Sequence, residues 1–543
     1  MRAPENGTVP ETLNPRRWIA LIAVALSTLV ISFDQTILNV ALPTMAAALH
    51  AGTGQQQWVV DAYTLAFAAL LLPAGLLGDR FGRRRLLTVG LGLFGVASTF
   101  GMLASSAGTL IAARAAMGLA GAFVMPLSMA VIPGLFPVAE RRRAIAILTA
   151  ALAAGAPFGP LIGGALLQHY WWGSVFLINL PLVAIGIVAC LLLLPESKDP
   201  AAPRLDLLSA LLGAGGLSAL TFGIIEGPAR GWSDPLVVAP LIGSVPTLAA
   251  LVLRSRRQRH PMLDLGLLAD PIYRWACIAV FLVSLVMLGA FFLLPIYFQG
   301  VLGTDALGTG LRMMPLMAGL MVAARASEKL HQRFGSRTLI TAGLLVLAAS
   351  MLVGSRTGTG DGYGFAACWL PFFGAGLGLT LIPASGAAIT RLPGDRAGVG
   401  SGLLQTLRQV GGVIGVAVFG SLLASAYQGA LHTAGLPGQL ARTAGQSVLA
   451  ADEIAGRLGH PALAASAHQA YLHGMGLVLV ASAVVAALSA LLVALRMPRR
   501  DGAVSPDEGA GADAGAAATV PRVAPVPAPV PTGLPESLGE SPA

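Results

Sequence analysis

The chain has 543 residues, of which 55% are hydrophobic and 11% are charged, and its mean hydropathy is +0.76. A soluble protein carries about 25% charged residues, so we expect most of this chain to lie in a lipid bilayer. The net charge of +9 would suit a nucleic-acid partner, but the arginines cluster in short gaps between apolar segments, as in cytoplasmic loops of membrane proteins. No basic face with interleaved aromatic residues accompanies them, which excludes nucleic-acid binding.

A membrane span needs about 20 largely apolar residues. Fourteen segments satisfy this rule, near residues 18–39, 56–77, 86–105, 109–132, 144–167, 174–194, 207–226, 235–253, 274–297, 309–326, 338–354, 364–389, 400–425 and 471–495. The first segment follows Arg16 and Arg17, as a signal peptide would. It is long, it carries Asp34 and many more spans follow, so we interpret it as the first transmembrane helix.

The arginines of the loops alternate along the chain. Gaps after even-numbered spans carry most of them, with clusters at 83–85, 141–143 and 254–259, whereas gaps after odd-numbered spans carry few. Because cytoplasmic loops are enriched in basic residues, this alternation predicts a multi-pass protein of the cell (cytoplasmic) membrane with both termini in the cytoplasm.

A short basic turn occurs twice. Residues 80–90 read RFGRRRLLTVG and residues 333–343 read RFGSRTLITAG, so seven residue types recur in the same order. The turns join spans two and three and spans ten and eleven, an offset of eight. With six spans per repeat, spans seven and eight become an insertion. The sequence therefore predicts an all-α polytopic membrane protein with two six-helix pseudo-symmetric bundles plus two inserted helices, related by an axis along the membrane normal.

The predicted organisation has five parts. They are a cytoplasmic N-terminal segment (1–17), an N-terminal six-helix bundle (18–194), a linker with the two inserted helices (195–260), a C-terminal six-helix bundle (261–497) with a long extracellular loop (426–470), and a cytoplasmic tail (498–543). The tail is rich in Pro, Ala, Gly and acidic residues and is expected to be disordered. The long loop is polar and has room for a surface helix.

Several motifs match one known family. GLLGDRFGRR at 75–84 resembles the signature loop of the major facilitator superfamily, with Gly75, Asp79, Gly82 and Arg83 in place and Arg80 between them. The other motifs are DQTILNVALP at 34–43, GAPFGPLIGG at 155–164, and the entry to span six with Trp171, Trp172, Phe176 and Asn179-Leu180-Pro181. Between Arg16 and Arg496 the chain resembles the fourteen-helix drug:proton antiporter subfamily of that superfamily. Arg114 fits a further motif, although Met117 stands where a glutamine is common.

The resemblance implies a function. It implies efflux of hydrophobic small molecules such as antibiotics or antiseptics, coupled to the proton gradient and carried out by alternating access. The protein is expected to be a monomer. An importer or exporter of an endogenous metabolite with the same fold, and a non-transporting membrane receptor or scaffold, are the alternatives. The choice of protons over sodium depends on the resemblance alone.

The chain is not expected to be an enzyme. The sequence has no nucleotide-binding loop of the G-x-x-x-x-G-K type, no metal-ligand cluster and no nucleophile with a paired base. Cofactors and a metal site are therefore not expected, and the energy for transport must come from an ion gradient or a separate subunit.

Charged residues inside spans are candidates for function, because a charge at the bilayer centre costs at least about 2.5–3.5 kcal/mol. Asp34, Asp61 and Arg114 are predicted at a similar depth and could form a cluster. Asp34 is the first candidate for the coupling proton, and Asp61 is the second. For Asp61 an interfacial residue on the first helical turn is a nearly equal alternative.

The signature loop allows two interpretations. Asp79 can pair with neighbouring arginines or cap a helix, and contacts made in only one of two rocking states would bias the transport equilibrium. The alternative is a topology determinant with a solvated ion pair.

The glycines of span five also allow two interpretations. Gly155, Gly159 and Gly163 are spaced for one helix face, Gly164 follows them, and Pro160 with Pro157 should bend the helix. A smooth seam for rocking halves and ordinary close packing both fit, and Gly411 and Gly415 repeat the spacing in span thirteen. Further candidates for a central cavity are Asn39, Gln299 and Arg408, although a helix-end role suits Gln299 equally well.

Overall fold

The computed structural model describes residues 17–198, 206–258, 264–392, 397–433 and 436–498. The predicted N-terminal segment and tail lie almost entirely outside the described residues. Within the described ranges the chain is helical and contains no strand. Each of the fourteen predicted spans overlaps a helix.

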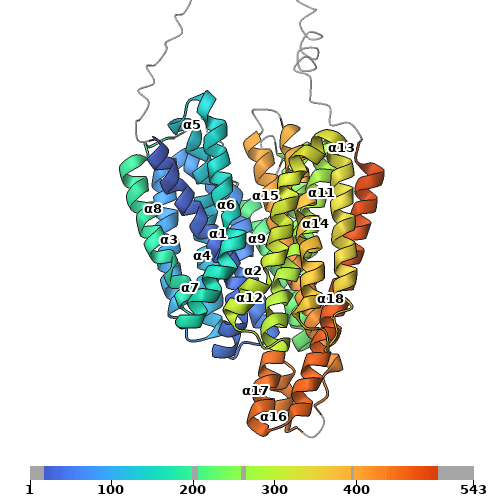
Figure 1. Cartoon of the computed structure of the whole chain (residues 1–543). Coiled ribbons are helices and arrows are strands. Elements are labelled where there is room, and N and C mark those ends of the chain that lie inside the picture. Colours follow the sequence, from blue (N-terminus) through green and yellow to red (C-terminus); the bar gives the residue numbers. More distant parts are fainter. Residues whose placement is uncertain (1–16, 199–205, 259–263, 393–396, 434–435, 499–543) are drawn as a thin grey trace, which may run out of the picture. The chain divides into compact units, whose positions relative to one another are not determined.

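The helices of the first half pack mainly against one another (Figure 1). They are α1 (Arg17–Ala48), α2 (Thr53–Phe81), α3 (Arg83–Met102), α4 (Ala107–Ala130), the short α5 (Ile132–Leu135), α6 (Val138–His169), the short α7 (Ser174–Leu177) and α8 (Asn179–Leu193). The main contacts join α1 with α6 and α8, and α4 with α2 and α3.

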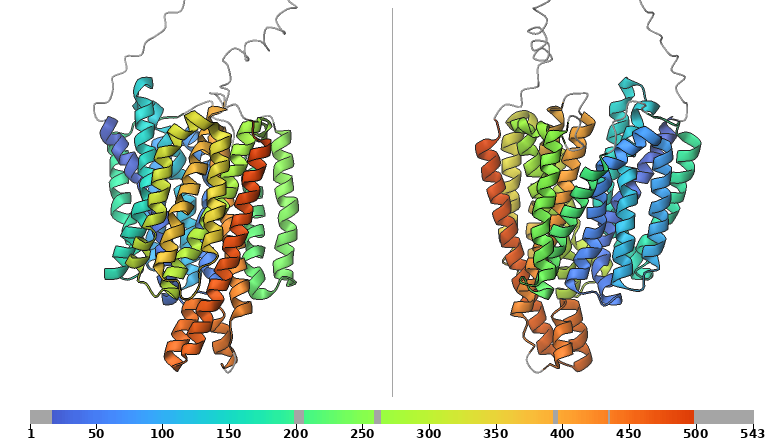
Figure 2. Two further views of the ribbon diagram at one scale, coloured as in Figure 1. Left: turned by 45° about the vertical axis from the view of Figure 1, so that its right-hand side comes forward. Right: turned by 180° about the vertical axis from the view of Figure 1, so that it is seen from behind.

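The second half follows the same plan. It contains α11 (Pro271–Ile296), continued by a π-helical turn η2 (Tyr297–Val301), α12 (Ala306–Arg312), α13 (Met314–Gly354), α14 (Tyr363–Thr390), α15 (Ala397–Ala430) and α18 (Pro461–Arg496). A 3-10 turn, η1 (Leu265–Ala269), precedes it. The main contacts join α13 with α14 and α18, and α11 with α15. Because α1 begins and α18 ends at the same end of the bundle (Figures 1 and 2), we name that end the terminal end and the other the distal end.

Helix length and composition give a lower number of spans than the sequence predicts. Eleven helices of the described residues are long and apolar enough to cross a membrane, or twelve if α2, which bends by 50° before Pro73, counts as one span. That number takes Ala306–Gly354 as one helix, although Gly335 interrupts it with φ 75° and ψ 164°. The total of fourteen therefore stays a prediction.

The two basic turns of the repeated sequence have the same backbone structure. Gly82 and Gly335 both have positive φ, 115° and 75°, a region that residues with a Cβ rarely adopt. In the helix after each turn a threonine hydroxyl donates to the carbonyl four residues earlier, from Thr88 at 2.9 Å and from Thr341 at 2.8 Å. The repeat in sequence is thus a repeat in local structure.

An arginine in each turn contacts an equivalent helix end. Arg84 donates to the carbonyl of Leu194 directly after α8, and Arg337 donates to the carbonyl of Ala494 in the last turn of α18. The last carbonyls of a helix have no partner within the helix and carry partial negative charge, so a cation there is stabilising. Since α8 and α18 contain the predicted sixth and fourteenth spans, these contacts support the offset of eight between the halves.

The predicted inserted helices are α9 (Leu207–Arg230) and α10 (Pro235–Arg257). They pack against each other, and α9 also packs against α2 of the first half and α15 of the second. A small apolar cluster of Leu65, Leu217 and Val413 marks this three-helix junction. The side chains of α10 are mostly exposed, as expected for a helix that faces lipid.

The long loop after the thirteenth span contains more helix than the sequence analysis expected. Helix α15 continues to Ala430, α18 begins at Pro461, and the short helices α16 (Gly438–Ala444) and α17 (Val448–Leu458) lie between them. Together these segments project from the distal end (Figures 1 and 2). The carbonyl of Gln446, between α16 and α17, accepts hydrogen bonds from the backbone and hydroxyl of Thr53 at the start of α2.

Candidate functional site

Asp34 and Arg114 form an ion pair inside the first half. The Nη1 atom of Arg114 lies 2.6 Å from Oδ2 of Asp34, and the two residues are only 1% and 3% exposed. Asp34 comes from the middle of α1 and Arg114 from the second turn of α4, so the pair joins two helices. The sequence analysis placed both residues at one depth, and the structure brings them into contact.

Further groups complete the surroundings of this pair. The Nδ2 atom of Asn179 donates to Oδ1 of Asp34 at 3.3 Å and to the hydroxyl of Ser98 at 3.2 Å. Arg114 donates from Nε to the Val59 carbonyl at 3.2 Å. Sequence reasoning used Asn179 only as part of a motif and missed Ser98, for which the sequence carries no signal.

An aromatic ring covers the guanidinium. The Cζ atom of Arg114 lies 4.3 Å from the centroid of the Tyr63 ring, within the range of a cation–π contact. Tyr63 is itself buried in α2, and its hydroxyl lies 3.5 Å from Nε2 of Gln35. The charge of Arg114 is therefore compensated by a carboxylate, a carbonyl and an aromatic face.

Asp61 has a different environment. It is completely buried in α2, and neither carboxyl oxygen has a hydrogen-bond partner among the described residues. Gln57 and Leu65 lie one turn away on the same face; Gln57 bonds to α15, and Leu65 packs against α9 and α15. Asp61 therefore lies where the first half meets the second half and the inserted helix.

The halves meet at the distal end. The Nε2 atom of Gln57 donates to the carbonyls of Val416 and Ala417 on α15, both at 3.1 Å. Gln299 in η2 donates to the Val40 carbonyl at 2.8 Å and accepts from the Thr44 hydroxyl at 3.3 Å. Gln299 thus connects the second half to α1.

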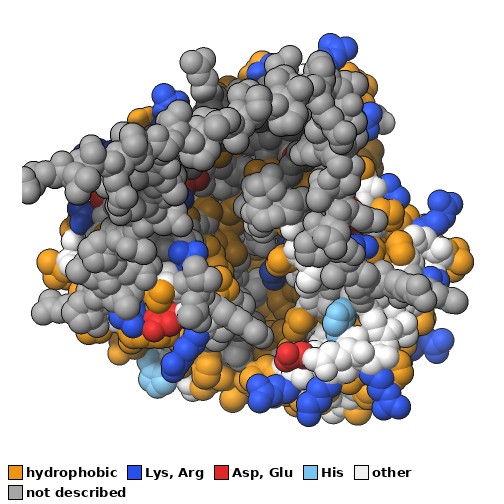
Figure 3. Space-filling view, turned by 90° about the horizontal axis from the view of Figure 1, so that it is seen from above, with side chains coloured by type: hydrophobic (Ala, Val, Ile, Leu, Met, Phe, Trp, Pro, Cys, Tyr) orange, Lys and Arg blue, Asp and Glu red, His pale blue; other side chains and the backbone are white. Residues whose placement is uncertain are grey.

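The terminal end is hollowed between the halves. Figure 3 looks onto this end and shows a central depression whose visible walls are mainly hydrophobic. Contact at the distal end and a depression at the terminal end are the arrangement of a two-half transporter open to one side only.

The signature loop is a local network of the first half. Arg83 lies 2.8 Å from Oδ1 of Asp79, and it donates to the Ala130 carbonyl at the end of α4 and to the Ser197 hydroxyl after α8. Arg80 is exposed and lies over the Phe81 ring. In the parts of the chain that the structure describes, no hydrogen bond or ion pair joins this loop to the second half.

Gly75 and Gly82 complete this loop. A Cβ on Gly75 would lie 3.9 Å from Pro126, an ordinary contact, whereas a Cβ on Gly82 would approach Oε1 of Glu196 to 2.6 Å. Gly82 is thus required by its positive φ, whereas the contact with Glu196 involves only the end of a flexible side chain, which can move.

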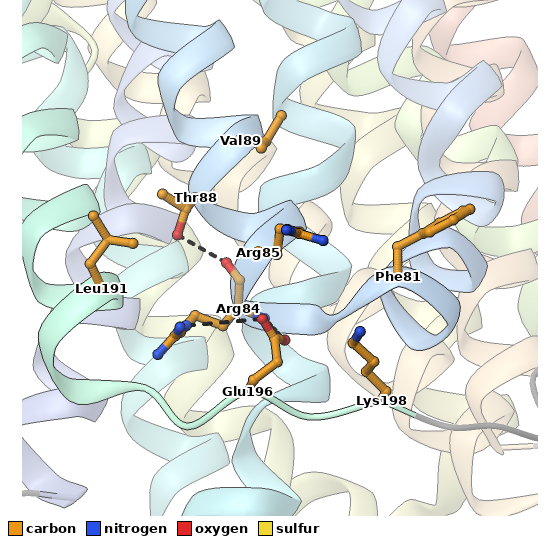
Figure 4. Close-up of a pocket in the computed structure, with 8 residues that line it drawn as sticks. All are labelled: Phe81, Arg84, Arg85, Thr88, Val89, Leu191, Glu196 and Lys198. Atoms are coloured by element: carbon orange, nitrogen blue, oxygen red, sulfur yellow. Dashed lines mark hydrogen bonds and ion pairs between the residues drawn. The ribbon is translucent and has the colours of Figure 1, made fainter.

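A cavity of about 410 Å³ lies beside the signature loop. Figure 4 shows its lining residues, Phe81, Arg84, Arg85, Thr88, Val89, Leu191, Glu196 and Lys198. Phe81, Val89 and Leu191 are each about half exposed. The cavity therefore opens on the outer surface of the first half, away from the buried cluster of Asp34 and Arg114.

The glycines of α6 allow a close approach to α1. A Cβ on Gly155 would overlap the Ser32 hydroxyl, and one on Gly159 would overlap the Thr36 hydroxyl; a Cβ on Gly163 would lie 2.9 Å from the Ile37 side chain. The Thr36 hydroxyl uses this proximity to donate to the Gly155 carbonyl at 2.8 Å.

The end of the same motif contacts the second half. A Cβ on Gly164 would lie 2.6 Å from the Cα atom of Leu307 in α12. A Cβ on Gly310 in α12 would approach the Pro160 carbonyl to 2.5 Å. The motif thus serves both kinds of contact that the sequence analysis considered: packing within one half and a seam between the halves.

Asn39 and Arg408 have fewer contacts. Asn39 is 7% exposed in α1 and donates at 3.5 Å to the Gln35 carbonyl of its own helix. Arg408 is partly exposed in α15, and its guanidinium has no hydrogen bond or ion pair with any described residue.

These features define a polytopic helical membrane protein built from two repeated halves. The chain belongs to the Major Facilitator Superfamily, whose sequence profile matches residues 24–416. Curated relatives agree over most of the chain. The Tetracenomycin C resistance and export protein of Streptomyces glaucescens is 31% identical, with 91% of this chain and 94% of the relative covered.

Two further relatives have related names. The Multidrug efflux pump LfrA of Mycolicibacterium smegmatis is 33% identical, covering 90% of this chain and 99% of the relative. The Puromycin resistance protein pur8 of Streptomyces alboniger is 35% identical, with 78% of this chain and 86% of the relative covered.

Solved structures share the fold. A bacterial homologue of the human lysosomal transporter Spinster, in an inward-facing and unoccupied conformation, has a TM-score of 0.65 at 19% identity and covers 91% of this chain and 99% of its own. A D-xylose-proton symporter has a TM-score of 0.58 at 12% identity, with 89% of this chain and 99% of the symporter covered. The transporter fold is therefore established.

Proposed function

We propose that this protein exports hydrophobic small molecules from the cell in exchange for protons, by alternating access. Support comes first from the relatives, whose names describe resistance, export and multidrug efflux. It comes also from the fold, in which two similar halves meet at one end and leave a depression at the other (Figure 3).

The proposed orientation places the terminal end in the cytoplasm of a cell-membrane protein. The arginine-rich loops lie at that end, as the distribution of positive charge in membrane proteins requires. The arrangement described here is then open to the cytoplasm and closed at the outside. A monomer suffices for this cycle, and the only energy source it needs is the proton gradient, without a cofactor.

The observation that carries proton coupling is the buried, unpartnered carboxyl of Asp61 at the contact of α2 with α15 and α9. An ionised carboxylate without a partner is costly to bury. Binding of a proton therefore favours the closed distal contact, and loss of the proton favours its separation. Asp34, in contrast, is paired with the guanidinium of Arg114 at 2.6 Å. The geometry thus favours Asp61 over Asp34 as the group that couples protons to the movement.

The test uses inverted membrane vesicles that contain the protein, with an interior acidified by respiration. Three fluorescent aromatic probes, one neutral, one cationic and one anionic, are offered with and without a protonophore. We expect accumulation of at least one probe, and its loss on addition of the protonophore. The Asp61→Asn variant should lose the accumulation at an unchanged amount of protein.

Glu226→Gln is the matched control, because it removes a carboxylate that is paired with Arg230 at the surface, 2.8 Å away. It should transport as the unmodified protein does. Accumulation that persists with the protonophore, or that follows an imposed sodium gradient instead, would contradict proton coupling. Failure of every probe to accumulate would contradict the export function.

A further inference from the structure

One turn of α15 carries polar groups whose hydrogen-bonding capacity the protein does not use. Gln405, Arg408 and Gln409 lie on one face of the helix, because residues three and four apart are neighbours. Among the described residues, Arg408 and Gln409 have no hydrogen-bond partner, and Gln405 reaches only the sulfur of Met125 at 4.0 Å. Such a set is uncommon in a membrane span, where polar side chains normally find partners.

This polar face is directed toward the region between the halves. Met125, which Gln405 contacts, belongs to α4 of the first half. Gly411 and Gly415, where a Cβ would overlap a carbonyl of α11, are three and seven residues after Arg408. Arg408 therefore lies between the α11 contact and the side of Gln405 that faces α4. Other flanks are covered by α2, α9 and α18. At a rise of about 1.5 Å per residue, Arg408 lies about 16 Å from the terminal end of α15, near the middle of a hydrocarbon core of about 30 Å.

Arg114 and Arg408, which both lie inside spans, differ in one respect. Arg114 is neutralised by Asp34 and held by the Val59 carbonyl. Arg408 has no such compensation from the described residues, although a charge at this depth is costly. An unpaired, partly exposed cation at this depth is suited to a ligand of opposite charge.

The second half offers no competing carboxylate at this depth. Helices α11, α14, α15 and α18 contain no Asp or Glu, and the one acidic residue of α13, Glu328, is exposed. The carboxylates buried in the spans, Asp34 and Asp61, both belong to the first half. A substrate in the central region therefore meets positive charge on the side of α15.

Taking the export function as given, we propose that the Arg408 face of α15 is the substrate-binding site of the second half, and that it selects amphipathic organic anions, namely apolar ring compounds with a carboxylate or an ionised phenol. The guanidinium can donate two parallel hydrogen bonds to a carboxylate, and the amide groups of Gln405 and Gln409 can donate beside it. The apolar body of the substrate lies against the hydrophobic walls visible in Figure 3.

The experiment compares three pyrene probes of similar shape: 1-pyrenebutyrate, its uncharged amide, and (1-pyrenylmethyl)trimethylammonium. Binding to the purified full-length protein is measured by equilibrium dialysis. We expect the carboxylate to bind at least about tenfold more tightly than the amide, the advantage of a charge-assisted hydrogen bond. Arg408→Gln should lower the affinity for the carboxylate to that for the amide, whereas Arg408→Lys should retain part of the preference.

Arg325→Gln is the matched control, since Arg325 is exposed near the terminal end of the second half; it should keep the preference. Equal binding of the three probes, tighter binding of the cation, no binding of the carboxylate, or a preference that survives Arg408→Gln would each overturn the proposal.

Transport of the same probes into inverted vesicles tests the export function separately from the anion site. Protonophore-sensitive uptake of the amide or the cation alone overturns the anion site and leaves export intact, whereas uptake of no probe overturns export.

Discussion

The guanidinium of Arg114 lies 2.6 Å from the carboxylate of Asp34, and both side chains are almost completely buried between α1 and α4. Removal of one member of a buried ion pair leaves an uncompensated charge in a medium of low dielectric constant. Removal of both members avoids that cost. The ion pair can therefore be tested by comparing the stability loss of the double variant with the sum of the losses of the two single variants.

We expect Asp34→Asn and Arg114→Gln each to destabilise the protein by about 3–5 kcal/mol, and the double variant to lose less than the sum. Asp61→Asn should cost far less, because Asp61 has no partner to lose. Thermal unfolding in detergent, followed by tryptophan fluorescence, measures these differences. Additive losses would show that the two residues do not act as a pair.

The same double variant tests the role of Asp34 in transport. If Asp34 only balances the charge of Arg114, then vesicles with the double variant should retain uptake driven by the pH gradient. If Asp34 carries the coupling proton, as the sequence analysis first suggested, that uptake should be lost while binding persists. The comparison is made at matched amounts of folded protein.

The ion pair between Asp79 and Arg83 in the signature loop should matter for transport more than for folding. Asp79→Asn removes the 2.8 Å contact with Arg83, and a surface or near-surface ion pair contributes only about 0–1 kcal/mol to stability. We expect normal expression and efflux slowed by up to about fivefold, because a bias of about 1 kcal/mol between the two transport states changes their ratio about fivefold.

Gln332→Ala, at the equivalent position of the second basic turn, is the control for the signature loop and should transport normally. Full transport activity of Asp79→Asn would contradict a role of this ion pair in the transport cycle and would favour the alternative, a determinant of topology.

Close packing of α6 on α1 makes a further prediction. Gly159→Ala introduces a methyl group where the Thr36 hydroxyl lies, and overpacking of this kind typically costs about 1–3 kcal/mol. The thermal midpoint in detergent should fall. Gly92→Ala in α3, where an added Cβ meets nothing within 4 Å, should leave the midpoint unchanged. Equal behaviour of the two variants would refute the close approach of α6 to α1.

The junction of the inserted helices should depend on pH. Burial of the Asp206 carboxyl opposes its ionisation, but hydrogen bonds from Arg254, Ser209 and Gln258 outweigh burial and hold the pKa of Asp206 well below its ordinary value. A lowered pKa stabilises the folded state above the ordinary pKa of about 3.9, and this stability is lost as the pH falls through the lowered value.

Asp206→Asn should therefore cost about 1–3 kcal/mol at pH 7 and progressively less in strong acid. Thermal midpoints at pH 7, 3.5 and 2 measure this. The control is Asp234→Asn, which removes the carboxylate that accepts the Leu236 amide at the start of α10 without breaking an ion pair with an arginine. A cost at Asp206 that stays constant over this range would contradict the assignment.

The sequence predicted the helices well but the loops less well. Each predicted span overlaps a helix, since a span is recognised by its own composition. The segment 426–470 was expected to be a polar loop with room for one surface helix, whereas it contains α16, α17 and the ends of α15 and α18. Only part of the surface of each of these helices packs against the distal end. Their sequences therefore lack the continuous apolar run by which a membrane span is recognised.

Candidate residues were found more readily than their partners. Asp34, Asp61 and Arg114 stood out because charge inside a span is rare, and their similar depth followed from counting residues. Which carboxylate faces Arg114 depends on the rotation of α1, α2 and α4 about their axes, and no local signal reports that rotation. Asn179 and Ser98 join the cluster for the same reason, and ordinary polar residues of this kind carry no sequence signal.

The sequence by itself determined the positions of the apolar segments, the alternation of loop charges and the internal repeat. These properties are local, because each span in a bilayer must satisfy its backbone hydrogen bonds within its own helix. Only the tertiary structure decided that Arg114 is neutralised by Asp34, that Asp61 is buried without a partner, and that Arg408 is left unpaired. Those facts depend on how helices far apart in the chain rotate and pack against one another, which no single segment encodes.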